Sequence, residues 1–169
     1  DGFKGYVRGQ EFQASLPFRL VSDVLDGFGL VASATFLKGE LEENVEAGVP
    51  AGDIPGLSEE SYSLTAYYEN RGWEVRVSGT KRGAFVAETR GTSLALTTVQ
   101  RQGIELWDAQ IGYDFDESGI ESLKGLRVTL QGQNLTDADD IEVNADDPRL
   151  VVRHQSFGRN FILGLNYRF

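Results

Sequence analysis

The sequence offers few of the side chains from which a catalytic site is built. His154 is the only histidine, and no nucleophile-elbow serine lies near it, so a Ser–His or acid–His site lacks its components. We interpret His154 as a solvated loop residue, with a ligand contact as the alternative. Cysteine, the His-Glu-x-x-His zinc motif and the Walker glycine loop are all missing. We therefore expect no enzyme activity, no cofactor and no metal site.

Carboxylates at strand positions are a second candidate for chemistry. Four of them fall on the polar side of expected strands: Glu69, Glu74, Asp108 and Asp114. Paired carboxylates cleave glycosides only at a defined separation, which a sequence does not give. We interpret these residues as charges that line a watery face.

The densest charge feature is an acidic run near the end of the chain. It contains Asp137, Asp139, Asp140, Glu142, Asp146 and Asp147. Oxygen ligands at such spacing could hold Ca²⁺, although the EF-hand glycine and terminal glutamate are missing. We interpret the run as a solvated loop, with a divalent-cation site as the alternative. A second acidic patch, Glu42, Glu43 and Glu46, has the same two interpretations.

The elements that must position these residues are strands. Side-chain alternation predicts strands over roughly Phe3–Leu16, Gly27–Glu40, Glu59–Glu69, Trp73–Arg82, Gly103–Phe115, Gly125–Leu135 and Gly158–Phe169. Trp107, Ala109 and Ile111, for example, oppose Asp108 and Gln110. The first strand mixes apolar and charged residues at both parities, so its facing stays open. No segment has a sustained helical period or the ~18 apolar residues of a membrane-spanning helix.

The last strand has one apolar face and ends on an aromatic ring. Its odd positions are Phe161, Leu163, Leu165, Tyr167 and Phe169. Such an ending is typical of the closing strand of a bacterial outer-membrane β-barrel.

The connections between these strands alternate in length. In order they hold 10, 18, 3, 20, 9 and 22 residues, as in barrels with short periplasmic turns and long extracellular loops. On this assignment the aromatic residues gather in two belts, with aliphatic residues between them. The long loops Leu41–Ser58, Gly83–Gln102 and Thr136–Phe157 would contribute to ligand capture.

Composition limits the class of partner. The formal net charge of −10 argues against nucleic acid, because phosphate binding needs clusters of Lys and Arg. The chain begins at Asp1 without a Met or a signal peptide, and we expect a processed product or an excised piece.

Several stretches together resemble the C-terminal part of a TonB-dependent outer-membrane receptor. They are Gly9-Gln10-Glu11, Ile54-Pro55-Gly56-Leu57-Ser58, Tyr67-Tyr68-Glu69, Arg76-Val77-Ser78, the block from Leu130 to Asp137 that ends in Asn-Leu-Thr-Asp, and the Tyr-Arg-Phe ending. The resemblance implies an antiparallel up-and-down transmembrane β-barrel of about 22 strands, closed by an N-terminal plug. Residues 1–169 would then be the C-terminal segment, about the last third of the barrel wall, without the plug.

The resemblance also implies a function and a set of partners. The function would be active uptake of a scarce nutrient (an iron chelate, an oligosaccharide or cobalamin) across the bacterial outer membrane. The partners would be the rest of the barrel and the plug, the TonB complex reached through the absent N-terminal part, outer-membrane lipid and the barrel-insertion machinery. Gly164, Tyr167 and Phe169 would form the barrel-assembly signal.

Two other classes remain open. One is a small self-closed β-barrel that acts as an adhesin or a ligand-binding module, because about eight strands can close around side chains or a small ligand. A further strand around Arg149–Val152 would supply the even count. The other is an outer-membrane enzyme with lumen carboxylates, which the single histidine argues against.

Overall fold

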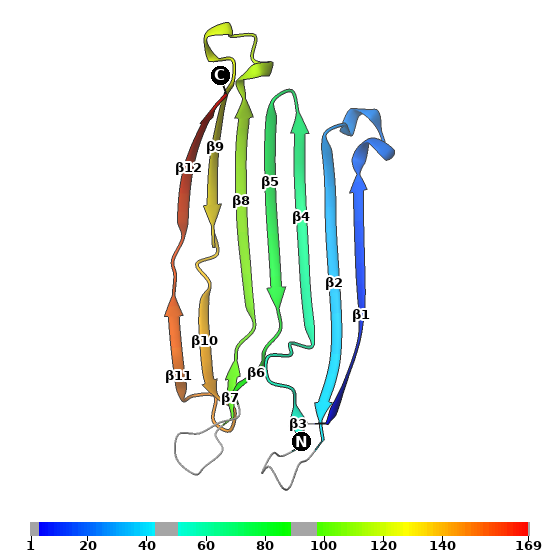
Figure 1. Cartoon of the computed structure of the whole chain (residues 1–169), viewed down its shortest axis with the longest axis vertical. Coiled ribbons are helices and arrows are strands. Elements are labelled where there is room, and N and C mark those ends of the chain that lie inside the picture. Colours follow the sequence, from blue (N-terminus) through cyan, green and yellow to red (C-terminus); the bar gives the residue numbers. More distant parts are fainter. Residues whose placement is uncertain (1–3, 43–50, 89–97, 169) are drawn as a thin grey trace.

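The computed structural model describes residues 4–42, 51–88 and 98–168, and its main feature is one antiparallel sheet (Figure 1). We call this sheet the wall. Its long strands are β1 (Gly5–Pro17), β2 (Phe28–Leu41), β4 (Glu60–Asn70), β5 (Trp73–Arg82), β8 (Ile104–Asp114), β9 (Leu126–Gln133) and β12 (Asn160–Tyr167). They lie in the order β1-β2-β4-β5-β8-β9-β12, so every long strand pairs with its neighbour in the sequence of long strands. All seven predicted strands are confirmed.

The connections divide the wall into two ends. At one end, which we call the turn end, lie two pairs of 3₁₀ turns, η1 (Phe18–Leu20) with η2 (Asp23–Leu25) and η3 (Phe115–Glu117) with η4 (Glu121–Leu123). The tight β4–β5 turn is at the same end (Figure 1). Its residues Arg71 and Gly72 have φ of 51° and 80°, so both adopt the left-handed conformation of a hairpin turn.

The opposite end, the loop end, differs from the prediction of irregular loops. The strands β6 (Phe85–Glu88), β7 (Val99–Arg101), β10 (Asp139–Asn144) and β11 (Val151–Ser156) form a second antiparallel sheet in the order β11-β10-β7-β6. We call this sheet the extension. Its order repeats that of β12, β9, β8 and β5, and each of its strands continues one of these four beyond a short interruption (Figure 1). A short strand, β3 (Gly52–Asp53), pairs with the end of β2.

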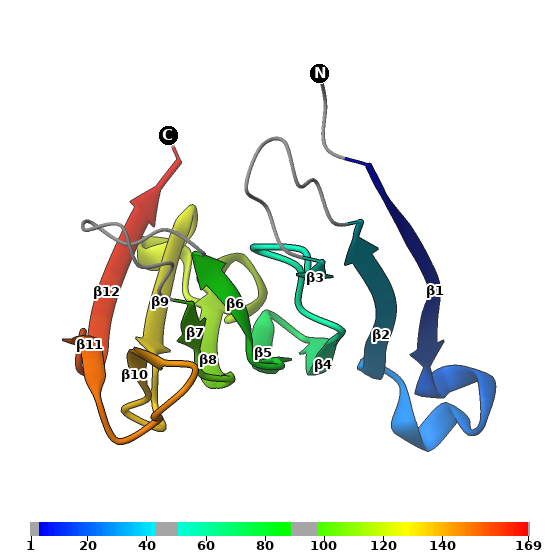
Figure 2. The same cartoon turned by 90° about the horizontal axis from the view of Figure 1, so that it is seen from below.

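The strand predicted around Arg149–Val152 exists in part, as β11. It pairs with β10 in the extension and does not add an eighth strand to the wall. In the described part of the chain the wall ends at β1 and at β12. Seen from below, the long strands follow an arc (Figure 2).

The register of the wall places most of the apolar residues of the seven strands on one face, although Val31, Leu106 and Ile162 lie on the other. Across the middle of the sheet Leu30 pairs with Ala66, Ala66 with Val77, and Val77 with Ala109. Leu163 pairs with Leu130 at the other edge. In β1, Phe12, Ala14 and Leu16 pair with Ala34, Ala32 and Leu30. The even positions of β1 therefore belong to the apolar face, which settles the facing that the sequence leaves open.

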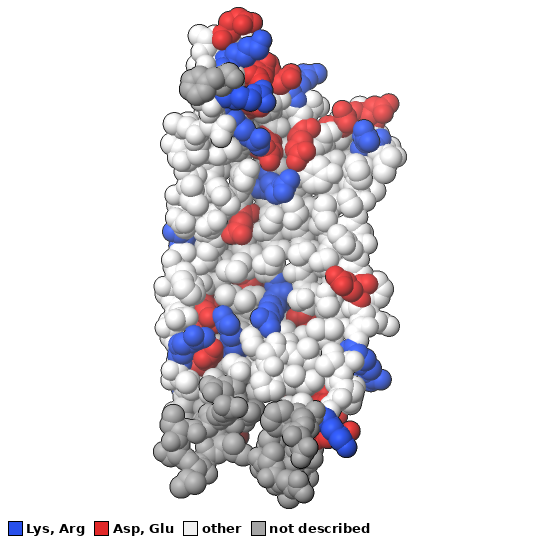
Figure 3. All heavy atoms as spheres, in the orientation of Figure 1, with Lys and Arg blue, Asp and Glu red and all other residues white. Residues whose placement is uncertain are grey.

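The opposite face of the wall is polar. Hydroxyl groups bridge neighbouring strands at Ser33 and Ser63 (2.8 Å between the Oγ atoms) and at Thr65 and Ser78 (3.0 Å between the hydroxyl oxygens). Figure 3 views one side of the molecule and shows acidic and basic side chains next to one another, without separation by sign.

No second sheet covers the apolar face within residues 4–42, 51–88 and 98–168. Leu163 and Leu165 are 67% and 70% exposed, and the buried apolar residues of the described part are Val99 and Val143, both in the extension. The wall differs from a soluble β-sandwich, because a sandwich packs the apolar faces of two sheets against each other, whereas the apolar face of this single sheet is exposed.

The aromatic residues of the apolar face gather toward the two ends of the strands. Near the turn end the ring centroids of Phe28 and Tyr68 lie 4.5 Å apart, and those of Trp73 and Tyr113 lie 4.7 Å apart. Toward the loop end Phe36 lies 5.7 Å from Tyr62. The predicted clustering is confirmed for these residues.

No helix of the described residues is long and apolar enough to span a membrane.

Candidate functional site at the loop end

The four carboxylates predicted to line the polar face each have a structural partner. Glu69 pairs with Arg76 at 3.3 Å, and Glu74 pairs with Arg127. The other two hold backbone instead: Asp108 Oδ1 accepts from the Asn134 amide at 2.8 Å, and Asp114 Oδ1 accepts from the Asp116 amide at 3.0 Å. None of them forms a pair of free acids for glycoside chemistry.

The Asn-Leu-Thr-Asp block joins the wall to the extension. The Asn134 side chain donates to the carbonyls of Ala138 and Gly158, both at 3.1 Å, and accepts from the Ala138 amide at 2.8 Å. Asn134 and Asp137 have positive φ, 50° and 58°. Asn and Asp tolerate this conformation, so the block can form the irregular stretch that separates β9 from β10.

The Pro-Gly-Leu-Ser stretch has a comparable structural role beside β5 and β6. The Ser58 hydroxyl donates to the carbonyls of Glu60 (3.0 Å) and Gly83 (2.9 Å). The Gly56 carbonyl accepts from Arg82 Nη2 at 2.8 Å.

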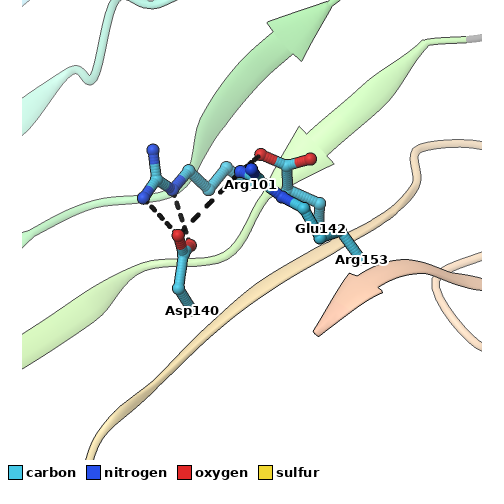
Figure 4. A network of polar contacts seen from close by, with 4 residues as sticks. All are labelled: Arg101, Asp140, Glu142 and Arg153. Carbon is cyan, nitrogen blue, oxygen red and sulfur yellow. Dashed lines mark hydrogen bonds and ion pairs between the residues drawn. The ribbon is translucent and has the colours of Figure 1, made fainter. Parts of the chain in front are cut away.

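An ionic network around the buried residue Asp140 lies at the centre of the extension (Figure 4). Asp140, which is 4% exposed, accepts from Arg101 Nε at 2.6 Å and also from Arg101 Nη2. Arg153 Nη2 donates to Glu142 and lies 3.9 Å from Asp140. The hydrogen bond to Asp140 raises the pKa of the Arg101 guanidinium above its usual value. The network ties β7, β10 and β11 together.

Two further acidic residues of the Asp137–Asp147 run, Asp139 and Asp147, are also used in ion pairs. His154 Nε2 lies 2.7 Å from Asp139 Oδ2, and Arg149 Nε donates to Asp147 Oδ1 at 2.8 Å. The hydrogen bond from His154 lowers the pKa of Asp139, with a further contribution from Ser156. Among the residues that the structure describes, no group of three or more His, Asp or Glu side chains is arranged to hold a metal ion. His154 is in strand β11, not in a solvated loop. Of the other acidic patch, Glu43 and Glu46 lie outside the described residues.

A hollow of about 590 Å³ lies where the wall meets the extension. We call it the junction hollow. Arg101, Asp140, Arg153, Gln155, Asp108 and Phe157 are among its lining residues. Asp108 belongs to the polar face of the wall, so the hollow opens on that face.

The sequence reasoning missed Arg101, Arg153, Gln155 and Phe157 because they lie in segments expected to be loops. A signal was present, since Asp140 and Glu142 alternate with Ile141 and Val143 as in a half-buried strand. The short length of these strands hid it.

Of the expected assembly-signal residues, Gly164 and Tyr167 lie in β12, and Phe169 lies outside the described residues. A Cβ on Gly164 would meet Thr129 Oγ1 at 2.5 Å, so glycine here lets β9 and β12 approach on the polar face.

Comparisons by sequence find no relative, because no protein-family model matches the chain and no curated protein matches it. A comparison of structures finds the crystal structure of the ferric citrate transporter FecA in the unliganded form, with a TM-score of 0.70 and 20% sequence identity. The match covers 97% of this chain and 24% of that chain, so this chain spans about a quarter of the length of the transporter. The chain therefore has the fold of a portion of that transporter, in agreement with its resemblance to the C-terminal part of a TonB-dependent receptor barrel.

Proposed function

We propose that this chain is the C-terminal part of the barrel wall of a TonB-dependent outer-membrane receptor that takes up a scarce nutrient. One observation carries the proposal: most of the apolar residues of the seven long strands lie on one continuous exposed face, and most of the polar residues lie on the other. Such a sheet suits hydrocarbon on one side and a watery lumen on the other.

The proposal requires partners for the two edge strands. Backbone groups at β1 and β12 must be paired in a bilayer, so the rest of the same barrel would supply the strands beside them. A plug and a TonB-contacting segment would come from the same larger protein. Enzymatic activity is not part of the proposal.

Fractionation and energised uptake test this function. The full-length protein, expressed in a Gram-negative host, should be recovered in the outer membrane. Cells that express it should accumulate radiolabelled ferric citrate, maltohexaose or cobalamin, and accumulation should stop when TonB is deleted. Recovery as a compact monomer without detergent would contradict the proposal and favour the small self-closed barrel.

The proposed assembly role of the chain end has its own test. Deletion of Phe169 from the full-length protein should lower the amount inserted in the outer membrane, because the terminal ring would be part of the signal read by the insertion machinery. Deletion of the exposed loop residue Arg149 serves as the control. Unchanged insertion after loss of Phe169 would remove this role.

A further inference from the structure

The junction hollow is shaped by strands that are far apart in the sequence. Its lining comes from β8 and β9 of the wall and from β7, β10 and β11 of the extension. Its volume of about 590 Å³ lies within the ~300–1,000 Å³ of small-molecule sites. The buried residue Asp140 and its partner Arg101 form one side of it, so that side is held in place before any ligand arrives.

The charges around the hollow do not suit an anionic ligand. Both guanidinium groups are already engaged by carboxylates, Arg101 by Asp140 and Arg153 by Glu142. Asp108 adds a further negative charge to the lining. A polycarboxylate chelate would have to compete with these internal carboxylates at close range, and like charges brought together in an interface are unfavourable.

The uncharged groups of the hollow suit hydroxyl groups. Gln133 and Gln155 line the hollow with amide groups, and Asp108 lines it with a carboxylate. Gln133 Oε1 already accepts from Asn160 Nδ2 and Asp108 Oδ1 from the Asn134 amide, so the Gln133 amide nitrogen and Asp108 Oδ2 are the groups that a ligand would meet. A hydroxyl group both donates and accepts, so it can bond to such a mixed set where a pure acceptor cannot. Phe157, which is 71% exposed, adds an aromatic face at the hollow. An exposed aromatic ring beside polar groups complements a ligand that is apolar on one face and polar at its edges.

We propose that the junction hollow binds a neutral oligosaccharide, which rests on the proposed uptake function and narrows its substrate class. The sugar ring stacks on Phe157, and its hydroxyl groups bond to Gln155, Gln133 and Asp108. The Arg101 guanidinium does not bind the ligand, because it is already paired with Asp140. The pair instead fixes the shape of the hollow.

Binding by the purified full-length protein in detergent tests the proposal. Maltohexaose, cellohexaose, xylohexaose and mannohexaose are titrated by calorimetry, with ferric citrate as the anionic probe. We expect at least one saccharide to bind and ferric citrate not to bind. Phe157→Ala should raise the Kd of the saccharide about ten-fold, from the loss of a stacked ring, and Gln155→Ala should raise it by a smaller factor.

Leu150→Ala is the matched control. Leu150 is an exposed apolar residue next to β11, like Phe157, but it does not line the hollow. The Kd of the Leu150→Ala variant for the saccharide should therefore equal that of the unaltered protein. The proposal is overturned if none of the four saccharides binds, or if one binds with a Kd that Phe157→Ala and Gln155→Ala leave unchanged. TonB-dependent accumulation of ferric citrate alone would overturn it too, while leaving the uptake function intact.

Discussion

At the scale of single residues, the most constrained side chain of the extension is Asp140. A carboxylate with so little exposure needs paired cations and filled hydrogen-bond sites to remain ionised. Arg101 supplies two hydrogen bonds from β7, and Arg153 lies close by on β11. The side chain thereby links three strands that the local sequence alone would leave independent.

Replacing Asp140 with Ala should loosen the extension. Two guanidinium groups would lose their shared partner, and the free energy of opening β7 and β10 should fall by on the order of 1–3 kcal/mol. Hydrogen–deuterium exchange of the full-length protein would measure this at the amides of these two strands. Asp147→Ala removes an exposed pair with Arg149 and should leave exchange in β7 and β10 unchanged. Equal effects of the two substitutions would refute the special role of Asp140.

The pair of Asp139 and His154 should make the β10–β11 hairpin sensitive to acid. The pKa of Asp139 is lowered in the folded protein by the hydrogen bond from His154. Its stabilising contribution is therefore complete above the ordinary value of about 3.8 and is lost as the pH falls through the lowered pKa. Exchange in the hairpin, corrected for the intrinsic pH effect, should rise in this range. The Asp139→Asn variant should lose that rise; if it titrates like the parent protein, another group is responsible.

At the scale of elements, the junction between wall and extension depends on one amide side chain. Asn134 makes three hydrogen bonds to backbone at Ala138 and Gly158, on both sides of the β10–β11 hairpin. The position of Asn in the Asn-Leu-Thr-Asp block is thus explained by its hydrogen bonds to backbone.

Asn134→Ala should detach the hairpin from the wall. The variant leaves the Ala138 amide and two carbonyls without their partner, at a cost on the order of 1–3 kcal/mol. Protease cleavage between β9 and β10 should become faster. Asn134→Asp keeps the acceptor for the Ala138 amide and loses the donor, so its cleavage rate should lie between those of the parent protein and Asn134→Ala. We expect cleavage to be slowest in the parent protein, faster in Asn134→Asp and fastest in Asn134→Ala, and a different order would contradict the role of Asn134.

At the scale of the whole molecule, the two faces of the wall are its defining property. Neighbouring residues of one strand belong to different environments, so the same substitution should have different effects one residue apart. Leu130 lies on the apolar face and Gln131 on the polar face of β9.

Leu130→Arg should reduce insertion of the full-length protein into the outer membrane far more than Gln131→Arg. A charge at a lipid-facing position of a barrel costs about 2–4 kcal/mol near the bilayer midplane, whereas a lumen position tolerates it. The amount of heat-modifiable protein in the outer-membrane fraction measures insertion. If both variants insert equally, the apolar face does not contact lipid.

The strands of the wall were predictable because each carries its own signal. Alternation in β5, β8 and β12 depends only on which face of a strand a residue occupies, and most of the long strands follow from it. The first strand shows the limit of this reasoning. Its pattern is mixed, and only pairing with Ala32 and Ala34 of β2 reveals that Phe12 and Ala14 lie on the apolar face.

The candidate site was not predictable to the same degree. Phe157, Arg153 and Arg101 are separated along the chain and lie in segments too short to show a period. They meet because β7, β10 and β11 continue the order of the wall strands, a relation that no local window contains.

The sequence by itself determined the positions of the long strands and the amphipathic character of the wall, because these properties follow from side-chain type and spacing along one strand. The up-and-down order of the strands was implied by the resemblance to a receptor barrel, and the structure shows it. Tertiary structure alone decided the facing of β1, the presence of the extension and the grouping of Arg101, Asp140 and Phe157 around one hollow. Those features depend on pairing between distant segments, and pairing is set by the register of the whole sheet.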